Sequence, residues 1–476
     1  MRTSPRAHEL RLQQLAACMS ATFALGAAAM PGQAHGISQA GLSAGIAYRV
    51  GALLQAATAS AILTVSSCAD DGSTGTLRQV MGISGDGDTI NLSGLLCSPI
   101  TLISGEIATT RNGLLLQGPT DRTLTITTPT RYSPPYNRLL HHTGIGNFHI
   151  DHLTLSNGKY ASSTGDAVGG CVNSSGGVIL SSSVVTGCTV SVTTTGISAY
   201  YAAGGAIYAK GFIQMSHSQI TGNTALASNN SNTALGGGLA SRGGVYAYYS
   251  AVSGNSALGV TVGSSVGKGG AAVVGGIVRL TSSTIDSNHA DVAGALYQTG
   301  TPSDSVRIKN STISGNRATG PIGGIAASSP LRIDNSTVAF NSANSNAAIS
   351  VSANVVAYSS IIAKNLISIS GVADLNIIGT GSTLSGSHNL IVSSNLSLPD
   401  TLTSDPRLVP LGDHGGPTRT HALVPLSPAV DHGNNLLALA FDQRGAGFSR
   451  AVGAAADIGA YERQTTDDEI FYDGVE

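Results

Sequence analysis

Residues 213–223, IQMSHSQITGN, decide the fold, because the same eleven-position pattern occurs six more times in the chain. Every copy ends in Asn or, once, Cys, with Ser five positions earlier and Ala or a larger apolar residue three, eight and ten positions earlier. The other copies are VILSSSVVTGC (178–188), VYAYYSAVSGN (245–255), VRLTSSTIDSN (278–288), VRIKNSTISGN (306–316), LRIDNSTVAFN (331–341) and VVAYSSIIAKN (355–365). Repetition of this kind is typical of a solenoid.

The spacing within each copy predicts two short strands joined at a corner. Positions ten and eight before the last residue, and positions five and three before it, each have the strand period of two. The three-residue step between the pairs breaks that phase and requires a bend. One such unit cannot bury its apolar residues alone, so successive units must stack.

The repeat length specifies the kind of solenoid. The anchor residues are 35 positions apart at first and 24 at the end, and 24 residues supply three short faces with turns. The sequence therefore predicts an all-β fold, a right-handed single-stranded parallel β-helix. Asn accepts a left-handed bend and its amide can bond to the Asn above and below. We expect a structural ladder of Asn223, Asn255, Asn288, Asn316, Asn341 and Asn365.

Glycine pairs mark a second corner of each coil, and the length between an anchor and the next pair varies. The pairs are 169–170, 204–205, 236–237, 269–270 and 323–324. The connecting stretches 189–203, 224–235 and 256–268 are long and leave the same corner of successive coils. They are therefore predicted to stack as one flap on one flank.

Composition excludes several classes of protein. Charged residues are 11% of the chain, the formal net charge is −2, and there are 61 glycines and no tryptophan. Without a basic stripe to neutralise phosphates, a nucleic-acid partner is not expected. The 41% hydrophobic content is too high for a disordered chain.

The chain divides into five predicted segments. Residues 1–34 have the basic start, apolar run and small residues of an export signal, and 35–60 are rich in Ala and Gly. Residues 61–395 are assigned to the β-helix with an N-terminal cap, 396–463 to an irregular C-terminal cap over the last coil, and 464–476 to an acidic tail. No stretch after the signal is long and apolar enough to span a membrane.

The cysteines agree with export. Four remain after the signal, and none lies in a CxxC motif or near a His at ligand spacing, so disulfides are favoured over zinc. Cys171 and Cys188 occupy the two exceptional corners of one coil, which suggests a pair, with free thiols as the alternative. Cys68 and Cys97 are predicted to tie down the N-terminal cap, where residues 75–84 form a short helix over the first coil.

Several C-terminal motifs resemble the choice-of-anchor Q domain family of bacterial surface proteins. They are Asp405-Pro406-Arg407-Leu408, Gly415-Gly416-Pro417, Ser427-Pro428-Ala429, Asp442-Gln443-Arg444-Gly445 and Asp457-Ile458-Gly459-Ala460-Tyr461-Glu462. The [IV]-x-x-N elements are also similar to repeats of chlamydial polymorphic outer-membrane proteins. The resemblance implies a right-handed β-helix that is secreted or attached to the bacterial cell surface or outer membrane.

No catalytic constellation emerges from the sequence, and no cofactor or metal site is expected. Ile150-Asp151-His152 and Arg307-Ile308-Lys309 have some likeness to motifs of polysaccharide-cleaving enzymes, but Ile150 and Ile308 fall on core positions of the repeat. The C-terminal group from Asp405 to Glu462 is the densest set of ionisable side chains. We interpret it as ion pairs and turn caps, with a site as the alternative.

Tyrosines are the better indication of function. Tyr200, Tyr201, Tyr208, Tyr246, Tyr248 and Tyr249 lie on or beside the first two long insertions. A Tyr ring offers flat area and a hydroxyl to a sugar or a protein surface, although packing of the flap explains it equally well. The predicted function is non-enzymatic adhesion to extracellular glycans or proteins by a monomer. The alternative is a polysaccharide lyase or glycoside hydrolase acting on acidic polysaccharide.

Overall fold

The computed structural model describes residues 60–129, 137–193, 199–229, 231–259, 265–301, 303–346, 348–369, 371–465 and 467. The predicted export signal, the Ala/Gly-rich segment up to residue 59 and most of the acidic tail lie outside the described residues. Contacts divide the chain after Ala59. All described residues belong to the unit that begins at Ser60. None of its helices is long and apolar enough to cross a membrane.

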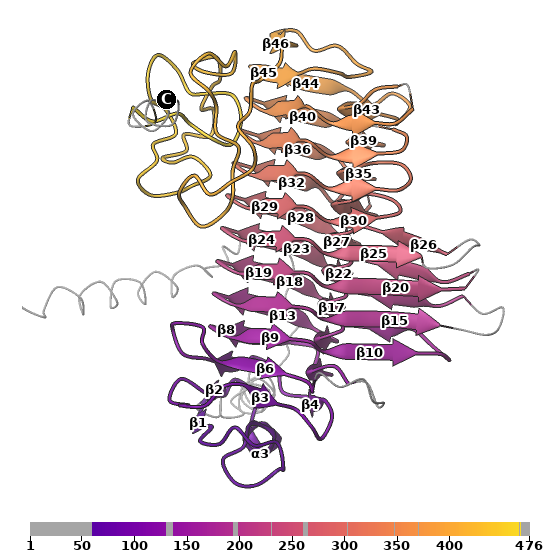
Figure 1. Ribbon diagram of the computed structural model, residues 1–476, viewed down its shortest axis with the longest axis vertical. Helices are drawn as coiled ribbons and strands as arrows, with labels where there is room; N and C mark the ends of the chain where they lie inside the picture. Colours follow the sequence, from indigo (N-terminus) through magenta and orange to yellow (C-terminus); the bar gives the residue numbers. More distant parts are fainter. Residues whose placement is uncertain are drawn as a thin grey trace, which may run out of the picture. The chain divides into compact units, whose positions relative to one another are not determined.

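Three parallel sheets form the sides of the column (Figure 1). Sheet 1 contains β1 (Ile62–Thr64), β2 (Thr89–Asn91), β5 (Leu114–Gln117), β8 (Asn147–Asp151), β13 (Gly177–Ser181), β18 (Phe212–Ser216), β23 (Gly244–Tyr248), β28 (Ile277–Thr281), β32 (Val306–Lys309), β36 (Leu331–Asp334), β40 (Val355–Tyr358) and β44 (Leu384–Ser387). Sheet 2 contains β3 (Ile100–Thr101), β6 (Thr125–Thr127), β9 (Thr154–Ser156), β14 (Val184–Thr186), β19 (Gln219–Thr221), β24 (Ala251–Ser253), β29 (Thr284–Asp286), β33 (Thr312–Ser314), β37 (Thr337–Ala339), β41 (Ile361–Ala363), β45 (Asn389–Ile391) and β46 (Thr401–Leu402). Sheet 3 contains β4 (Ile107–Thr109), β7 (Leu140–His142), β12 (Val172–Ser174), β17 (Ile207–Ala209), β22 (Leu239–Ser241), β27 (Ala272–Val274), β31 (Leu296–Gln298), β35 (Ile325–Ala327), β39 (Ile349–Val351) and β43 (Leu375–Ile377).

Two smaller parallel sheets form the flap, which leaves the corner between sheets 2 and 3. The first flap sheet contains β10 (Lys159–Ser162), β15 (Thr189–Thr193), β20 (Thr224–Ser228), β25 (Ser256–Gly259), β30 (His289–Ala290), β34 (Arg317–Ala318), β38 (Ser342–Ala343) and β42 (Leu366–Ile367). The second flap sheet contains β11 (Ala167–Val168), β16 (Tyr201–Ala203), β21 (Thr233–Leu235) and β26 (Val266–Lys268). The three long insertions thus stack as predicted, and residues 159–168 add a layer that the sequence did not indicate.

The strand register confirms the repeat that the sequence defines. Val178 pairs with Ile213, and Leu180 pairs with Met215; the same two positions then pair in every coil up to Val355 and Ala357. These apolar side chains are buried in one continuous core. The fold is therefore a right-handed parallel β-helix, because consecutive parallel strands connect with that hand.

Two files of hydrogen-bonded polar side chains run up the inside of the column. In the serine file, the Ser218 backbone N–H donates to Ser250 Oγ at 3.1 Å, and Ser250 N–H donates to Ser283 Oγ at 3.2 Å. In the asparagine file, both N–H groups of Asn255, backbone and amide, donate to Asn288 Oδ1 at 2.9 Å. The predicted ladder of six asparagines is confirmed, and each member is buried.

Asp374 ends the asparagine file. Its carboxylate accepts the amide of Asn365 at 2.8 Å, so it occupies the place of a seventh Asn. Burial raises the pKa of Asp374 to about 6, against the hydrogen bonds from Asn365 and Ser393 that lower it.

The glycine corner is partly different from the prediction. Gly204 has a φ of 67°, and a Cβ there would lie 2.2 Å from the Ile207 carbonyl oxygen, so the corner requires glycine. In the later coils, however, the left-handed position is taken by Ala293 and Ile322. The repeating corner pair is therefore 322–323 and not 323–324, and the corner at 293–294, which has a single glycine, was not predicted. Close packing against neighbouring coils holds these residues in a conformation that they disfavour.

The N-terminal end is closed as predicted. A short helix, α3 (Leu77–Ile83), begins after its N-cap Thr76 and buries Leu77, Val80 and Met81 against the first coils. The pair Cys68–Cys97 forms a disulfide beside it. Exposed strand edges of the first coil are covered in this way.

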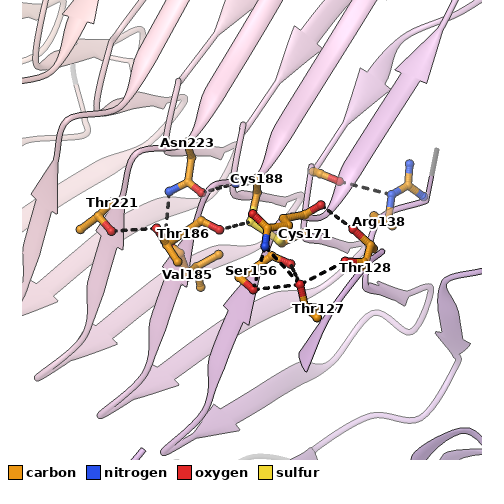
Figure 2. Close-up of a disulfide and its surroundings, with 12 residues drawn as sticks. Thr127, Thr128, Arg138, Ser156, Cys171, Val185, Thr186, Cys188, Thr221 and Asn223 are labelled. Carbon is orange, nitrogen blue, oxygen red and sulfur yellow. Dashed lines mark hydrogen bonds between the residues drawn. A yellow bond between two sulfur atoms is a disulfide. The ribbon is translucent and has the colours of Figure 1, made fainter. Parts of the chain in front are cut away.

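The second disulfide joins Cys171 and Cys188, whose Cα atoms are 5.6 Å apart. Figure 2 shows Cys188 beside Asn223, and the Cys188 backbone N–H donates to Asn223 Oδ1 at 2.9 Å. The cysteine therefore starts the asparagine file. Both predicted disulfides are confirmed, and such bonds persist in oxidising compartments.

The segment 403–465 lies along the outer face of sheet 2, beside β29, β33, β37 and β41 (Figure 1). Its side chains form a second core with Ile361, Ala363 and Leu390. The sequence predicts a cap over the last coil, but residues 392–402 already cover that end. Leu396 packs on the main core there, and Asn395 hydrogen-bonds both backbone groups of Ile377.

Candidate functional site

The flap is a two-sheet layer with its own small-residue core. Side chains from its two sheets meet in a cluster of Ala and Val that is almost fully buried: Ala167, Val190, Val192, Ala202, Ala225, Ala227, Ala234, Ala257 and Ala290. Successive side chains of a strand point to opposite faces of its sheet, so the neighbours of these buried residues lie on the other face. The second flap sheet therefore presents its other face to the outer surface of sheet 3.

That meeting place, the flap corner, is lined by Val168, Tyr201, Ala203, Tyr208, Leu235 and Ala240. Tyr208 lies on β17 of sheet 3, and Tyr201 lies on β16 of the flap. Tyr208 is 5% exposed, whereas Tyr201 is only partly buried. The corner therefore has a packed apolar floor with one accessible aromatic ring.

Charged groups surround Tyr201. The guanidinium of Arg242, which is exposed, donates to the Tyr201 hydroxyl at 3.2 Å and also bonds to Tyr208. The Asp166 carboxylate accepts the Tyr201 backbone N–H at 3.1 Å. Burial, with Asp166 adding to it, raises the pKa of Tyr201, so the phenol stays protonated. A phenol, a guanidinium and a carboxylate thus lie at one edge of the corner.

Further polar and aromatic groups continue along the same side of the column. The outward positions of sheet 3 in successive coils are His141, Asn173, Tyr208, Ala240, Val273 and Tyr297. The Lys268 amine lies 5.1 Å from the centre of the Tyr297 ring. At the N-terminal end, His141 Nδ1 is 2.9 Å from Glu106, which also pairs with Arg138 at 3.0 Å.

The structure separates the six tyrosines that the sequence grouped. Tyr200 packs against the flap core, and only Tyr201 and Tyr208 come together. Tyr246 and Tyr248 lie on β23, with their side chains on the outer face of sheet 1. Tyr249 stacks on His217, with ring centres 5.2 Å apart, and approaches Gly445 of the C-terminal segment.

Sequence reasoning did not single out Asp166 and Arg242. Neither belongs to a repeated position of the eleven-residue pattern, and each is an isolated charge in a chain where charges are few. A usable signal was their place at strand ends. Asp166 immediately precedes β11 of the flap, and Arg242 immediately follows β22 of sheet 3. Stacking of the coils brings them to one tyrosine.

The enzyme-like triplets are accounted for by the coil geometry. Ile150 and Ile308 are fully buried in the core. His152 Nδ1 lies 2.9 Å from the Asp151 carboxylate, and His152 takes the left-handed bend at the corner between sheets 1 and 2. Among the described residues no group of three or more His, Cys, Asp or Glu is arranged to hold a metal ion.

The ionisable residues of the C-terminal segment form the ion pairs and caps that the sequence predicts. Arg444 pairs with Asp442 at 2.7 Å, and Arg450 pairs with Glu462 at 3.0 Å, all four side chains being buried. Most of their remaining bonds join backbone groups, for example from Asp457 N–H to Glu462, and Arg450 also donates to Asn310 Oδ1. Burial raises the pKa of Glu462, and the Arg450 guanidinium opposes that rise. These contacts hold an irregular chain in place.

Comparison with known proteins gave one structural likeness. No protein-family model matches the chain, and no curated protein matches it. A solved structure described as pectate lyase Pel9A is similar over 85% of this chain and 96% of its own, with a TM-score of 0.47 and 12% identity. At this level the neighbour says nothing about the chemistry of the present chain.

Proposed function

We propose that this protein is an exported β-helix that adheres to extracellular glycans through the flap corner, without cleaving them. The observation that carries the proposal is the arrangement around Tyr201, where an accessible ring is bordered by a guanidinium and a carboxylate. Sugar rings pack on aromatic faces, and their hydroxyls bond to such charged groups.

Export is supported by the two disulfides and by the signal-like residues 1–34. Attachment to a bacterial surface rests on the resemblance to the choice-of-anchor Q family. In that case the segment 403–465 is a rigid platform fixed to the side of the column, and the flap corner remains uncovered on another side.

A double variant, Arg242→Gln with Tyr201→Phe, is expected to bind the glycan roughly tenfold or more weakly. The two changes remove the hydrogen bonds at the accessible ring, and bonds to charged groups contribute about 1.5–3 kcal/mol each. A glycan array probed with the purified mature chain identifies the ligand, and titration calorimetry with that glycan measures the loss.

The control is Gln219→Ala, which removes an exposed polar side chain from β19 of sheet 2 and should leave both glycan binding and the melting temperature unchanged. Equal binding by the double variant and the unchanged protein would exclude the flap corner. Ultraviolet absorbance from unsaturated products, on incubation with acidic polysaccharides and calcium, would instead establish the lyase alternative.

A further inference from the structure

A second surface, separate from the flap corner, carries an unusual file of cations. On the outer face of sheet 1, Arg279 pairs with Arg307 in the next coil, and Arg307 pairs with Arg332 in the one after. Neighbouring strands are about 4.8 Å apart. Three arginine residues therefore follow one another in register along the column, one in each coil.

Three arginines at the same position of successive coils are not expected by chance in a chain of this composition. Only 24 of 476 residues are Lys or Arg, about one in twenty. Like charges directly opposite each other on a sheet also destabilise it. Three arginines in register, in a chain with so few charges, therefore require a compensating partner.

The protein supplies only part of that compensation. Asp334, whose side chain is 1% exposed, pairs with Arg307 at 3.2 Å and with Arg332 at 2.8 Å. Arg279 donates to the carbonyl oxygens of Val278 and Ser305 and forms no ion pair with a described residue. Lys309 is next to Arg307 on the same face and likewise has no ion pair within the described part of the chain.

Aromatic rings lie at both ends of the file. Tyr246 holds the position before Arg279 in the register, and its ring meets Phe212 edge-on at 6.2 Å. At the other end, the Arg332 guanidinium is 5.3 Å from the centre of the Tyr358 ring. The file with its rings, which we call the cationic strip, comprises Tyr246, Arg279, Arg307, Lys309, Arg332 and Tyr358, with four cations against the one carboxylate of Asp334.

We infer that the cationic strip binds a linear anionic polysaccharide that lies along the axis of the column. Cationic residues that recur once per coil match a polymer with an acidic group on successive sugars, whether carboxylate or sulfate. The partly exposed rings at the ends offer packing faces for the sugars. Nucleic acid fits less well, because the disulfides indicate an oxidising compartment and the chain as a whole is not basic.

The test uses the full mature chain with Arg279→Gln and Lys309→Gln combined. Neither residue holds Asp334, so the buried carboxylate keeps both of its arginines and the fold is preserved. Binding to polygalacturonate, heparin and uncharged dextran is measured by fluorescence titration at 50 and 200 mM salt. We expect roughly tenfold weaker binding to the acidic polymer, a shallower dependence on salt, and no binding to dextran.

A matched control removes the same charge elsewhere, with Lys210→Gln and Arg317→Gln, both exposed on other sides of the column. If the control variant loses as much affinity for the acidic polymer as the strip variant, net charge alone explains the loss and the assignment is overturned. Unchanged affinity of the strip variant would also overturn it. Tighter binding to single-stranded DNA than to either acidic polymer would also overturn it. Preference for polygalacturonate or for heparin decides between carboxylate and sulfate. The Tyr201/Arg242 variant should still bind the acidic polymer through the strip. This result would separate the strip from the flap corner, so that either proposal can fail without the other.

Discussion

Replacing Asn288 with Ala should lower the free energy of unfolding by about 4 kcal/mol, because several buried partners lose their bonds at once. Asn288 Oδ1 accepts two N–H groups of Asn255, and its amide donates to the Val252 carbonyl and to Asn316 Oδ1, each at 2.9 Å. Alanine replaces none of these bonds. The groups left behind are fully enclosed, and water cannot reach them.

Denaturant unfolding followed by circular dichroism measures this loss as a lower midpoint. The control is Gln219→Ala, which removes an exposed amide from β19 and should change the stability by less than about 0.5 kcal/mol. Similar midpoints for the two variants would mean that the asparagine file contributes little. If the denaturant dependence of the unfolding free energy differs between the variant and the unchanged protein, the coils do not unfold together. Native-state hydrogen exchange would then measure the local stability around residue 288.

Acidification should remove about 3 kcal/mol of stability through His421 between pH 7 and pH 4. Burial lowers the pKa of His421 from 6.5 to about 4. Its Nδ1 lies 2.7 Å from the Val409 carbonyl, and its Nε2 lies 2.7 Å from Ser314 Oγ, so the neutral ring joins the C-terminal segment to sheet 2. The unfolded chain takes up the proton first as the pH falls. Stability is therefore complete above pH 6.5 and is lost progressively down to pH 4.

Other charges act on the same region, so the measurement must isolate this ring. His414 opposes protonation of His421, and Asp286, which pairs with Arg419, favours it. Asp374 acts in the opposite direction, since its raised pKa costs stability above pH 6 and that cost disappears as the pH falls towards 4.

The measured quantity is the stability difference between the unchanged protein and His421→Gln, taken at pH 7 and at pH 4.5. The glutamine does not titrate, so the difference between the two proteins should shift by about 2–3 kcal/mol in favour of the variant on acidification. A constant difference would show that His421 already carries its proton, or that its site is open to water.

The inward side of the column could be predicted from sequence in detail. Positions such as Val178, Leu180 and Val185 recur at fixed distances from an anchor, and burial of one strand face forces that period. The asparagine file and the Cys171–Cys188 pair followed from the same register. The flap was predicted from the long stretches between an anchor residue and the next glycine pair.

The outward side could be predicted only in part, because outward residues are not buried and the repeat therefore does not restrict which residue types occupy them. Arginines 279, 307 and 332 all stand nine positions before an anchor, and aligning that position across coils would have revealed the file. The six tyrosines, in contrast, lie close in sequence but on different sides of the column. Proximity along the chain is a poor guide when each coil passes three faces.

The sequence by itself thus determined the β-helix, its asparagine ladder, its disulfides and the existence of a flap, because each depends on a repeat or on spacing within one coil. Only the tertiary structure decided where the segment 403–465 lies, and which charges meet at Tyr201. That segment has no period, and its position depends on Ile361 and the hydroxyls of Thr284 and Thr312 needing cover on sheet 2. Contacts between non-repeating parts depend on shapes and partners that become neighbours only after the coils have stacked.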